Sequence, residues 1–87
     1  MTQKITARLC VDTFMVWMSV LNSAQEDEGI TVSKYISLQK KYHEEIIQLF
    51  HELTWQDQID ATVVTHCTVW ERMLDEEQLA AYLIMRD

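Results

Sequence analysis

Apolar residues recur at steps of three and four over the first long segment, residues 2–21, which predicts an amphipathic α-helix. They form two adjacent stripes on this helix. One stripe holds Ile5, Leu9, Val16 and Val20. The other holds Cys10, Phe14, Trp17, Met18 and Leu21. Because the two stripes together are wider than a one-sided face, we expect this helix either to be central in the fold or to face a second chain.

The second helical pattern covers residues 32–53, with Thr31 or Ser33 as the residue that caps its first turn. Its apolar positions are Val32, Tyr35, Ile36, Leu38, Tyr42, Ile46, Leu49, Phe50 and Leu53. Lys40 and Lys41 stand four residues before Glu44 and Glu45, a spacing that permits two ion pairs worth about 0.2 kcal/mol each. Residues 22–31 between the two helices are predicted to form a loop, with Gly29 at a turn position of positive φ.

A third helix is predicted from Thr54, which forms a pattern like a capping box with Asp57. Its apolar stripe consists of Ile59, Val63, Cys67, Trp70 and Leu74. Residues 62–70 are rich in β-branched side chains, so a strand is the alternative here. A strand needs a partner strand, and no other segment has the pattern of one. We therefore predict a helix.

A fourth helix is predicted over residues 75–85, where Asp75 and Gln78 form a second capping pattern. Its apolar side consists of Leu79, Tyr82, Leu83 and Met85. Since no Gly or Pro separates the third and fourth helices, a single long helix is the alternative. The chain is thus predicted to be one all-α domain over residues 1–87, a small bundle of three to four helices with the first helix as a candidate dimer interface.

Composition supports this fold class. The 87 residues include one Gly and no Pro, which argues against a fold of tight β-hairpins, since their turns need residues that tolerate positive φ. A chain of this size buries only about 60% of the surface of its unfolded form, and an oligomer would relieve that shortage.

Charge is distributed unevenly along the chain. The net charge is −7, which disfavours direct binding of nucleic acid through a basic face. Residues 1–43 hold five basic and four acidic groups, a net of +1, whereas residues 44–87 hold two basic and ten acidic groups, a net of −8. The acidity therefore belongs to the C-terminal half.

Motifs for catalysis or metal binding are missing from the sequence. There is no His-Glu-x-x-His or Glu-x-x-His, no Gly-x-Ser-x-Gly, and no glycine-rich phosphate loop. His66 and Cys67 are adjacent on a predicted helix, where neighbouring side chains do not face each other. We therefore expect no cofactor, no metal and no enzymatic activity. An acid–base pair among the fourteen carboxylates is the remaining enzymatic hypothesis.

Location is predicted from the apolar runs and the cysteines. The longest unbroken apolar run, residues 14–18, is far shorter than the roughly 20 residues that a membrane span requires. Cys10 and Cys67 lie far apart in the sequence without a disulfide-rich or metal-binding spacing. We expect reduced thiols in a cytoplasmic protein that does not enter a membrane.

Acidic side chains line the polar sides of the second and third helices. Along the third they are Asp57, Asp60, Glu71 and Asp75, in line with Thr68 and interrupted by Val64. Along the second, Glu45 and Glu52 flank Gln48. If the two helices are neighbours, these carboxylates merge into one face. That face is either a solvated surface or a docking surface for arginines and lysines that otherwise hold phosphates.

Aromatic residues would anchor such a docking surface. Of Trp17, Trp55 and Trp70, we expect Trp70 in the core. Trp55 is the one we expect to be most exposed, although the usual burial of large aromatic residues favours its packing into the corner between the second and third helices. The candidate partner-binding residues are Glu45, Glu52, Trp55, Asp57, Asp60, Glu71, Asp75 and Glu76.

These features suit a small acidic binding protein, an inhibitor or adaptor that docks on a basic protein, such as a nuclease or a nucleic-acid-binding complex, through its C-terminal half. Inhibitors of this size and charge that mimic nucleic acid are typical of phages and plasmids, an analogy that rests on size and charge alone. The alternative hypothesis is an obligate homodimeric assembly subunit that uses the apolar face of the first helix.

Overall fold

The computed structural model describes residues 4–86, which form an all-α fold with no strand among them. The helices are α1 (Ala7–Glu26), α2 (Val32–His51), α3 (Trp55–Thr65), α4 (Thr68–Met73) and α5 (Glu76–Arg86). The predicted start of the first helix at residue 2 lies outside the described residues, and the prediction of helix over residues 4–6 is wrong, because Thr6 is extended and caps α1. None of the described helices is long and apolar enough to cross a membrane.

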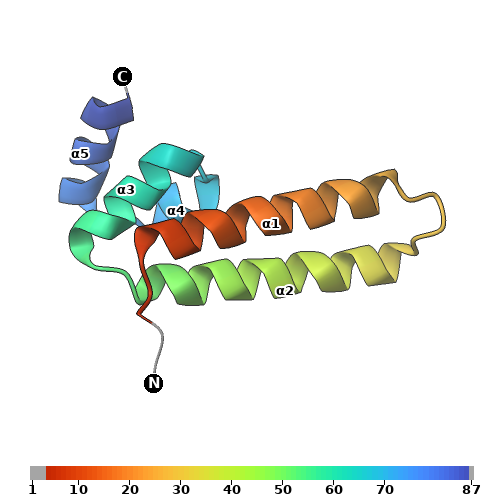
Figure 1. Ribbon diagram of the computed structural model, residues 1–87. Coiled ribbons are helices and arrows are strands. Elements are labelled where there is room, and N and C mark those ends of the chain that lie inside the picture. Colours follow the sequence, from red (N-terminus) through yellow and green to blue (C-terminus); the bar gives the residue numbers. More distant parts are fainter. Residues whose placement is uncertain (1–3, 87) are drawn as a thin grey trace.

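The molecule consists of a head and an arm. α1 and α2 form a long antiparallel pair, and α3, α4 and α5 gather at one end of it (Figure 1). We call these three helices, with the ends of α1 and α2 that they cover, the head, and we call residues 15–43 the arm. The Cα trace measures 44 × 37 × 16 Å, so the molecule is thin in one direction.

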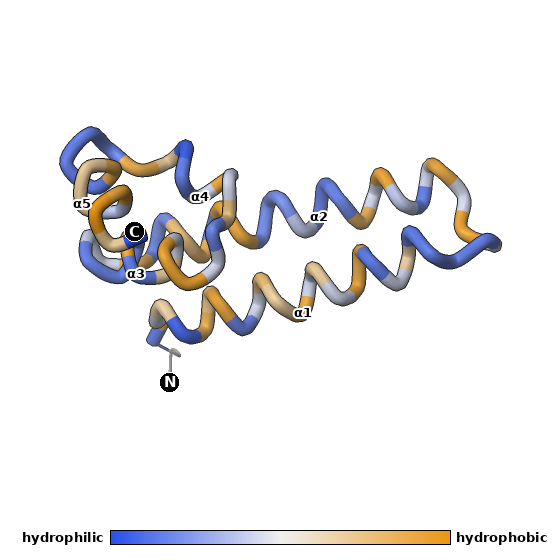
Figure 2. Tube along the Cα trace, turned by 90° about the horizontal axis from the view of Figure 1, so that it is seen from above, coloured by the Kyte–Doolittle hydropathy of each residue, from blue (hydrophilic) through white to orange (hydrophobic). Residues whose placement is uncertain are grey.

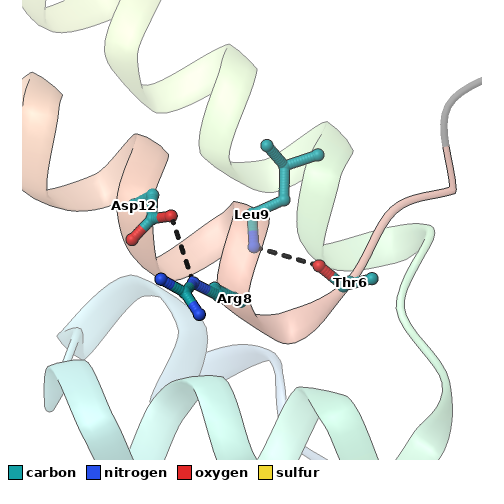
Figure 3. A network of polar contacts seen from close by, with 4 residues as sticks. All are labelled: Thr6, Arg8, Leu9 and Asp12. Carbon is teal, nitrogen blue, oxygen red and sulfur yellow. Dashed lines mark hydrogen bonds and ion pairs between the residues drawn. The ribbon is translucent and has the colours of Figure 1, made fainter.

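Side-chain caps fix where the helices begin. Thr6 Oγ1 accepts a hydrogen bond from the Leu9 amide at 3.1 Å and caps α1, where Arg8 and Asp12 form an exposed ion pair of 3.9 Å (Figure 3). Of the two predicted caps of α2, Thr31 fills the role, with a bond of 3.2 Å from the Lys34 amide. Thr54 caps α3 as predicted, accepting from the Asp57 amide at 3.2 Å.

The predicted loop between the first two helices is shorter than expected. α1 continues to Glu26, so the prediction that residues 22–26 are loop is wrong; this stretch contains neither Gly nor Pro to end the helix. The turn is instead closed by Asp27, whose Oδ1 accepts from the Gly29 amide at 2.9 Å. Gly29 does not have a positive φ, because this side-chain turn keeps it in an ordinary conformation.

The segment predicted as a single third helix is broken into two. α3 ends at His66, which adopts the left-handed conformation with φ 53°, and α4 begins after Cys67. The strand alternative for residues 62–70 is wrong, since residues 62–65 and 68–70 are helical. A single helix through residues 54–85 is also wrong, because the chain is extended at Leu74. Thr62 and Thr65 donate to the carbonyls four residues earlier, so these hydroxyls are satisfied within the helix.

The core is centred on Trp70, which is 0% exposed, as the sequence predicts. Its ring lies 5.6 Å from the rings of Phe14 and Phe50, and its Nε1 donates to the Ile46 carbonyl at 3.0 Å. The predicted stripe of the third helix is confirmed: its members are buried, except the half-buried Val63. α1, α2 and α4 are thus joined through one tryptophan.

The arm leaves apolar side chains exposed. Cys10 and Leu21 of α1 are buried, but Val16 and Val20 of its other predicted stripe are not, and on α2 Val32 and Ile36 are also exposed. The reason is that only two helices form the arm, so each can bury only the side that faces the other. Figure 2 shows apolar positions along both helices beyond the part that the head covers.

Candidate protein-binding surface

A buried polar network fixes the corner where α2, α3 and α5 meet. Gln78 is 3% exposed, and its Nε2 donates to Gln58 Oε1 at 2.8 Å and to the Trp55 carbonyl at 3.1 Å. Gln58 Nε2 in turn donates to the Phe50 carbonyl at 3.0 Å. Within residues 4–86, no buried side-chain nitrogen or oxygen lacks a hydrogen-bond partner. The start of α5 is therefore held directly against the start of α3.

The start of α5 brings carboxylates to this corner. Asp75 and Gln78 form the predicted capping box. The backbone N–H of Gln78 donates to Asp75 Oδ1 at 2.7 Å, and the backbone N–H of Asp75 donates to Gln78 Oε1 at 3.0 Å. Glu76 and Glu77 follow in the first turn, where the helix dipole favours negative charge. All three acidic residues are exposed.

Trp55 is 48% exposed, so it lies at the surface instead of being buried in the corner between α2 and α3, the position that the usual burial of large aromatic residues favoured. It is the first residue of α3, and its carbonyl is the group that Gln78 binds. Glu52, the exposed C-terminal cap of α2, comes three residues earlier at the same corner. We call Glu52, Trp55, Asp75 and Glu76 the Trp55 patch.

The other four candidate residues lie elsewhere. Asp57 and Asp60 are half-buried on α3, and Asp60 accepts from Gln56 Nε2 at 3.0 Å. Glu71 is half-buried on α4 and accepts from the Tyr82 hydroxyl at 3.4 Å. Glu45 accepts from Trp17 Nε1 at 2.9 Å. The carboxylates of Asp60, Glu71 and Glu45 each accept a hydrogen bond from another side chain of the molecule.

The two predicted acidic lines do not merge. α3 packs against α1, α4 and α5, and α2 packs against α1 and α4, so α2 and α3 are not packed side by side along their lengths. The expected ion pairs of Lys40 with Glu44 and of Lys41 with Glu45 do not form, because their lysine nitrogens and carboxylate oxygens are more than 4.0 Å apart. The ion pair found within residues 4–86 joins Arg8 and Asp12. Glu45 is bound to Trp17 instead.

The buried thiol of Cys10 and the half-buried phenol of Tyr42 are held in their protonated forms. Burial raises the pKa of Cys10 to about 11, with a further contribution from the negative charges of Glu52 and Asp57. Burial, followed by the effect of the nearby Cys67, raises the pKa of Tyr42 to about 12. Neither group is therefore ionised near neutral pH, and a buried protonated thiol is a poor nucleophile. In residues 4–86 no three His, Cys, Asp or Glu side chains gather as a metal site.

Two features of the site were missed from the sequence. The capping pattern pointed to Gln78, but nothing in the spacing linked it to Gln58, twenty residues earlier. The arm also carries shallow open hollows on its α2 side. One, of about 450 Å³, is lined by Leu21, Ile36, Gln39, Lys40, Tyr42, His43 and Glu44. Its neighbour, nearer the loop, is lined by Gln25, Ile30, Thr31, Val32 and Tyr35.

Comparison of the chain with models of protein families, with curated proteins and with solved structures finds no match.

Proposed function

We propose that this protein is a small acidic binding protein, an inhibitor or adaptor, that docks on a basic protein through the Trp55 patch. The observation that carries the proposal is the bond of 3.1 Å between Gln78 Nε2 and the Trp55 carbonyl, which holds the half-exposed Trp55 at the start of α3 against the start of α5, where Asp75 and Glu76 are exposed. An aromatic anchor with a charged rim is the arrangement that concentrates binding energy at protein interfaces.

The partner class follows from charge. Glu76 and the second carboxylate oxygen of Asp75 can accept hydrogen bonds from arginine and lysine side chains, since the first oxygen of Asp75 accepts from the Gln78 backbone amide. Arginines and lysines that hold phosphates are found on nucleases and nucleic-acid-binding complexes, and a carboxylate surface that mimics nucleic acid would occupy them. Opposite charges also speed association. We place this binding in the cytoplasm, since both cysteines are free thiols. Phage and plasmid inhibitors provide the analogy of size and charge.

The test compares the wild-type chain with two variants immobilised for affinity capture. The patch variant carries Trp55→Ala and Glu52→Lys, and the control carries Val64→Ala and Glu28→Lys, which change exposed apolar surface and net charge in the same sense away from the patch. We expect the wild type and the control to retain the same basic protein at low salt and to release it at high salt. The patch variant should not retain it.

Titration with the purified partner then measures the loss of affinity directly. We expect the patch variant to bind the partner at least about 100-fold more weakly than the wild type, because an aromatic hot spot contributes about 2 kcal/mol or more. Equal affinity of the patch variant and the wild type would contradict the proposal. Asp57, Asp60 and Glu71 are unsuitable for this test, because they are half-buried and their reversal would disturb the fold.

A homodimeric assembly subunit is the second candidate function, and one observation favours it. Val16 is 62% exposed on the outer side of α1, between the exposed side chains of Met15 and Val20. Apolar side chains that gather on a protruding element are typical of an interface. Sedimentation of the wild type and of a Val16→Lys variant tests this candidate. A dimer that the substitution dissociates supports it, and a strict monomer contradicts it.

A further inference from the structure

The α1–α2 pair has one side that the head does not cover. Figure 1 shows α3, α4 and α5 gathered on one side of the pair, where Phe14 and Phe50 pack against Trp70. Glu45 lies about 140° around α2 from Phe50, so the bond of 2.9 Å from Trp17 Nε1 to Glu45 joins the two helices on the other side. No helix within residues 4–86 packs over that bond. We call the side of α1 and α2 that carries Trp17 and Glu45 the open face.

Four exposed charged side chains lie in one line along α2 on the open face. We call them the charged stripe: Lys34, Lys41, Glu45 and Glu52. Their spacings of seven, four and seven residues keep them within about 40° of one another around the helix. Glu52 continues this line, because as the C-terminal cap it keeps a helical backbone conformation. The two lysines lie toward the loop and the two glutamates toward the head, and none of the four takes part in an ion pair within residues 4–86.

The charged stripe is complementary to a reversed copy of itself. Lys34 and Glu52 each stand nine residues from position 43. Lys41 and Glu45 each stand two residues from it. When a second α2 lies antiparallel on the first, centred at the level of position 43, every lysine of the stripe therefore comes opposite a glutamate of the other helix. A parallel arrangement sets lysine on lysine and glutamate on glutamate, which weakens association, so the order of charges selects the antiparallel one.

α1 adds apolar side chains to the open face. Val20 follows Trp17 by three residues and so lies on the same side of α1, with Val16 one turn before it. These valines are 39% and 62% exposed. The ring of Trp17 lies 6.2 Å from that of Tyr42, so this part of α1 is level with the centre of the charged stripe. A twofold axis at that level brings Val16 close to Val16 of a second copy.

We propose that two copies of this chain dimerise through their open faces, with α1 antiparallel on α1 and α2 antiparallel on α2. The twofold axis crosses the interface at right angles to the helices, so each contact is made twice and the dimer is closed. The valines of α1 bury apolar surface, and the charged stripe of α2 fixes the register. This inference rests on the homodimeric function proposed above, to which it adds the α2 surface and the relative direction of the two chains.

Sedimentation velocity across a concentration series tests the inference with charge-swap variants. Lys41→Glu and Glu45→Lys each set like charges opposite each other twice in the dimer, and each should weaken it about tenfold or more. An equimolar mixture of the two variants sets opposite charges together again, so the mixed dimer should be tighter than the dimer of either variant alone. Both substitutions leave the residues of the Trp55 patch unchanged, so docking on a basic partner is measured separately.

Lys40→Glu is the matched control. It makes the same change of charge as Lys41→Glu, also at an exposed position, but about 100° around α2 from Lys41, and it should leave the dimer intact. Three results would overturn the inference. A monomer at every concentration contradicts the homodimeric function as well. A dimer that Val16→Lys dissociates and Lys41→Glu does not contradicts only the arrangement inferred here, as does a mixture of the two charge-swap variants that dimerises no more tightly than each alone.

Discussion

Gln78 Nε2 donates to Gln58 Oε1 at 2.8 Å and joins α5 to α3 inside the head. Gln78→Leu keeps much of the volume but leaves Gln58 Oε1 and the Trp55 carbonyl without this donor in a buried place. We expect the free energy of unfolding to fall by about 1–3 kcal/mol, the cost of leaving buried polar groups unpaired. Urea unfolding followed by circular dichroism measures it.

The control for this prediction is Gln56→Leu on α3, the helix that carries Gln58. Gln56 is exposed, and its Nε2 bonds to Asp60 at the surface. Its replacement should change the free energy of unfolding by no more than about 0.5 kcal/mol. Equal losses for Gln56→Leu and Gln78→Leu would contradict the role given to the buried pair.

Trp70 offers a second test of the core. Trp70→Phe preserves an aromatic ring between Phe14 and Phe50 but removes the donor to the Ile46 carbonyl and leaves a small cavity. We expect a loss of about 2 kcal/mol in the free energy of unfolding. Trp17 donates its Nε1 hydrogen to Glu45 at the surface, so Trp17→Phe should lower the free energy of unfolding by less than about 1 kcal/mol. A smaller loss at Trp70 than at Trp17 would show that Trp70 is not the centre of the packing.

His66 holds the break between α3 and α4 in a conformation that side chains disfavour. Its φ is 53°, and its side chain is exposed, so replacement by glycine removes the steric cost without removing buried contacts. We expect His66→Gly to raise the free energy of unfolding by about 0.5–1 kcal/mol. His66→Val should lower it, because β-branched residues fit this conformation worst. Thermal unfolding of both variants checks the order, and a less stable glycine variant would contradict it.

The fold was predictable where a local pattern determines it. Thr54 and the Asp75–Gln78 pair cap helices where the sequence indicated, and the stripe from Ile59 to Leu74 is the core side of α3 and α4. The break at His66 was not predictable, because no Gly, Asn or Pro marks it. It depends on tertiary packing, which holds Cys67 and Trp70 in the core on the far side of the break.

The candidate site was predictable only in part. Trp55 and Asp75 could be placed at the starts of two helices because one follows a cap and the other is a cap, but not at one shared corner. Whether the acidic lines of the second and third helices share a face depends on which helices are neighbours. Helical periodicity shows which residues share a face of one helix, but not which helices pack against each other. The separation of Glu45 from Asp60 therefore could not be foreseen.

Alkaline pH should destabilise the protein through the ionisation of Cys10, which is buried, and Tyr42, which is half-buried. The pKa of Cys10 is raised from 9.0 to about 11 and that of Tyr42 from 10.0 to about 12, so the folded state holds these protons more tightly than the unfolded state. Their contribution to stability is complete below pH 9 and is lost as the pH rises through 11 and 12. We therefore expect the denaturation midpoint to fall between pH 9 and pH 12. In the Cys10→Ala, Tyr42→Phe double variant this fall should be smaller, and an identical pH profile for the variant and the wild type would contradict the assignment to these residues.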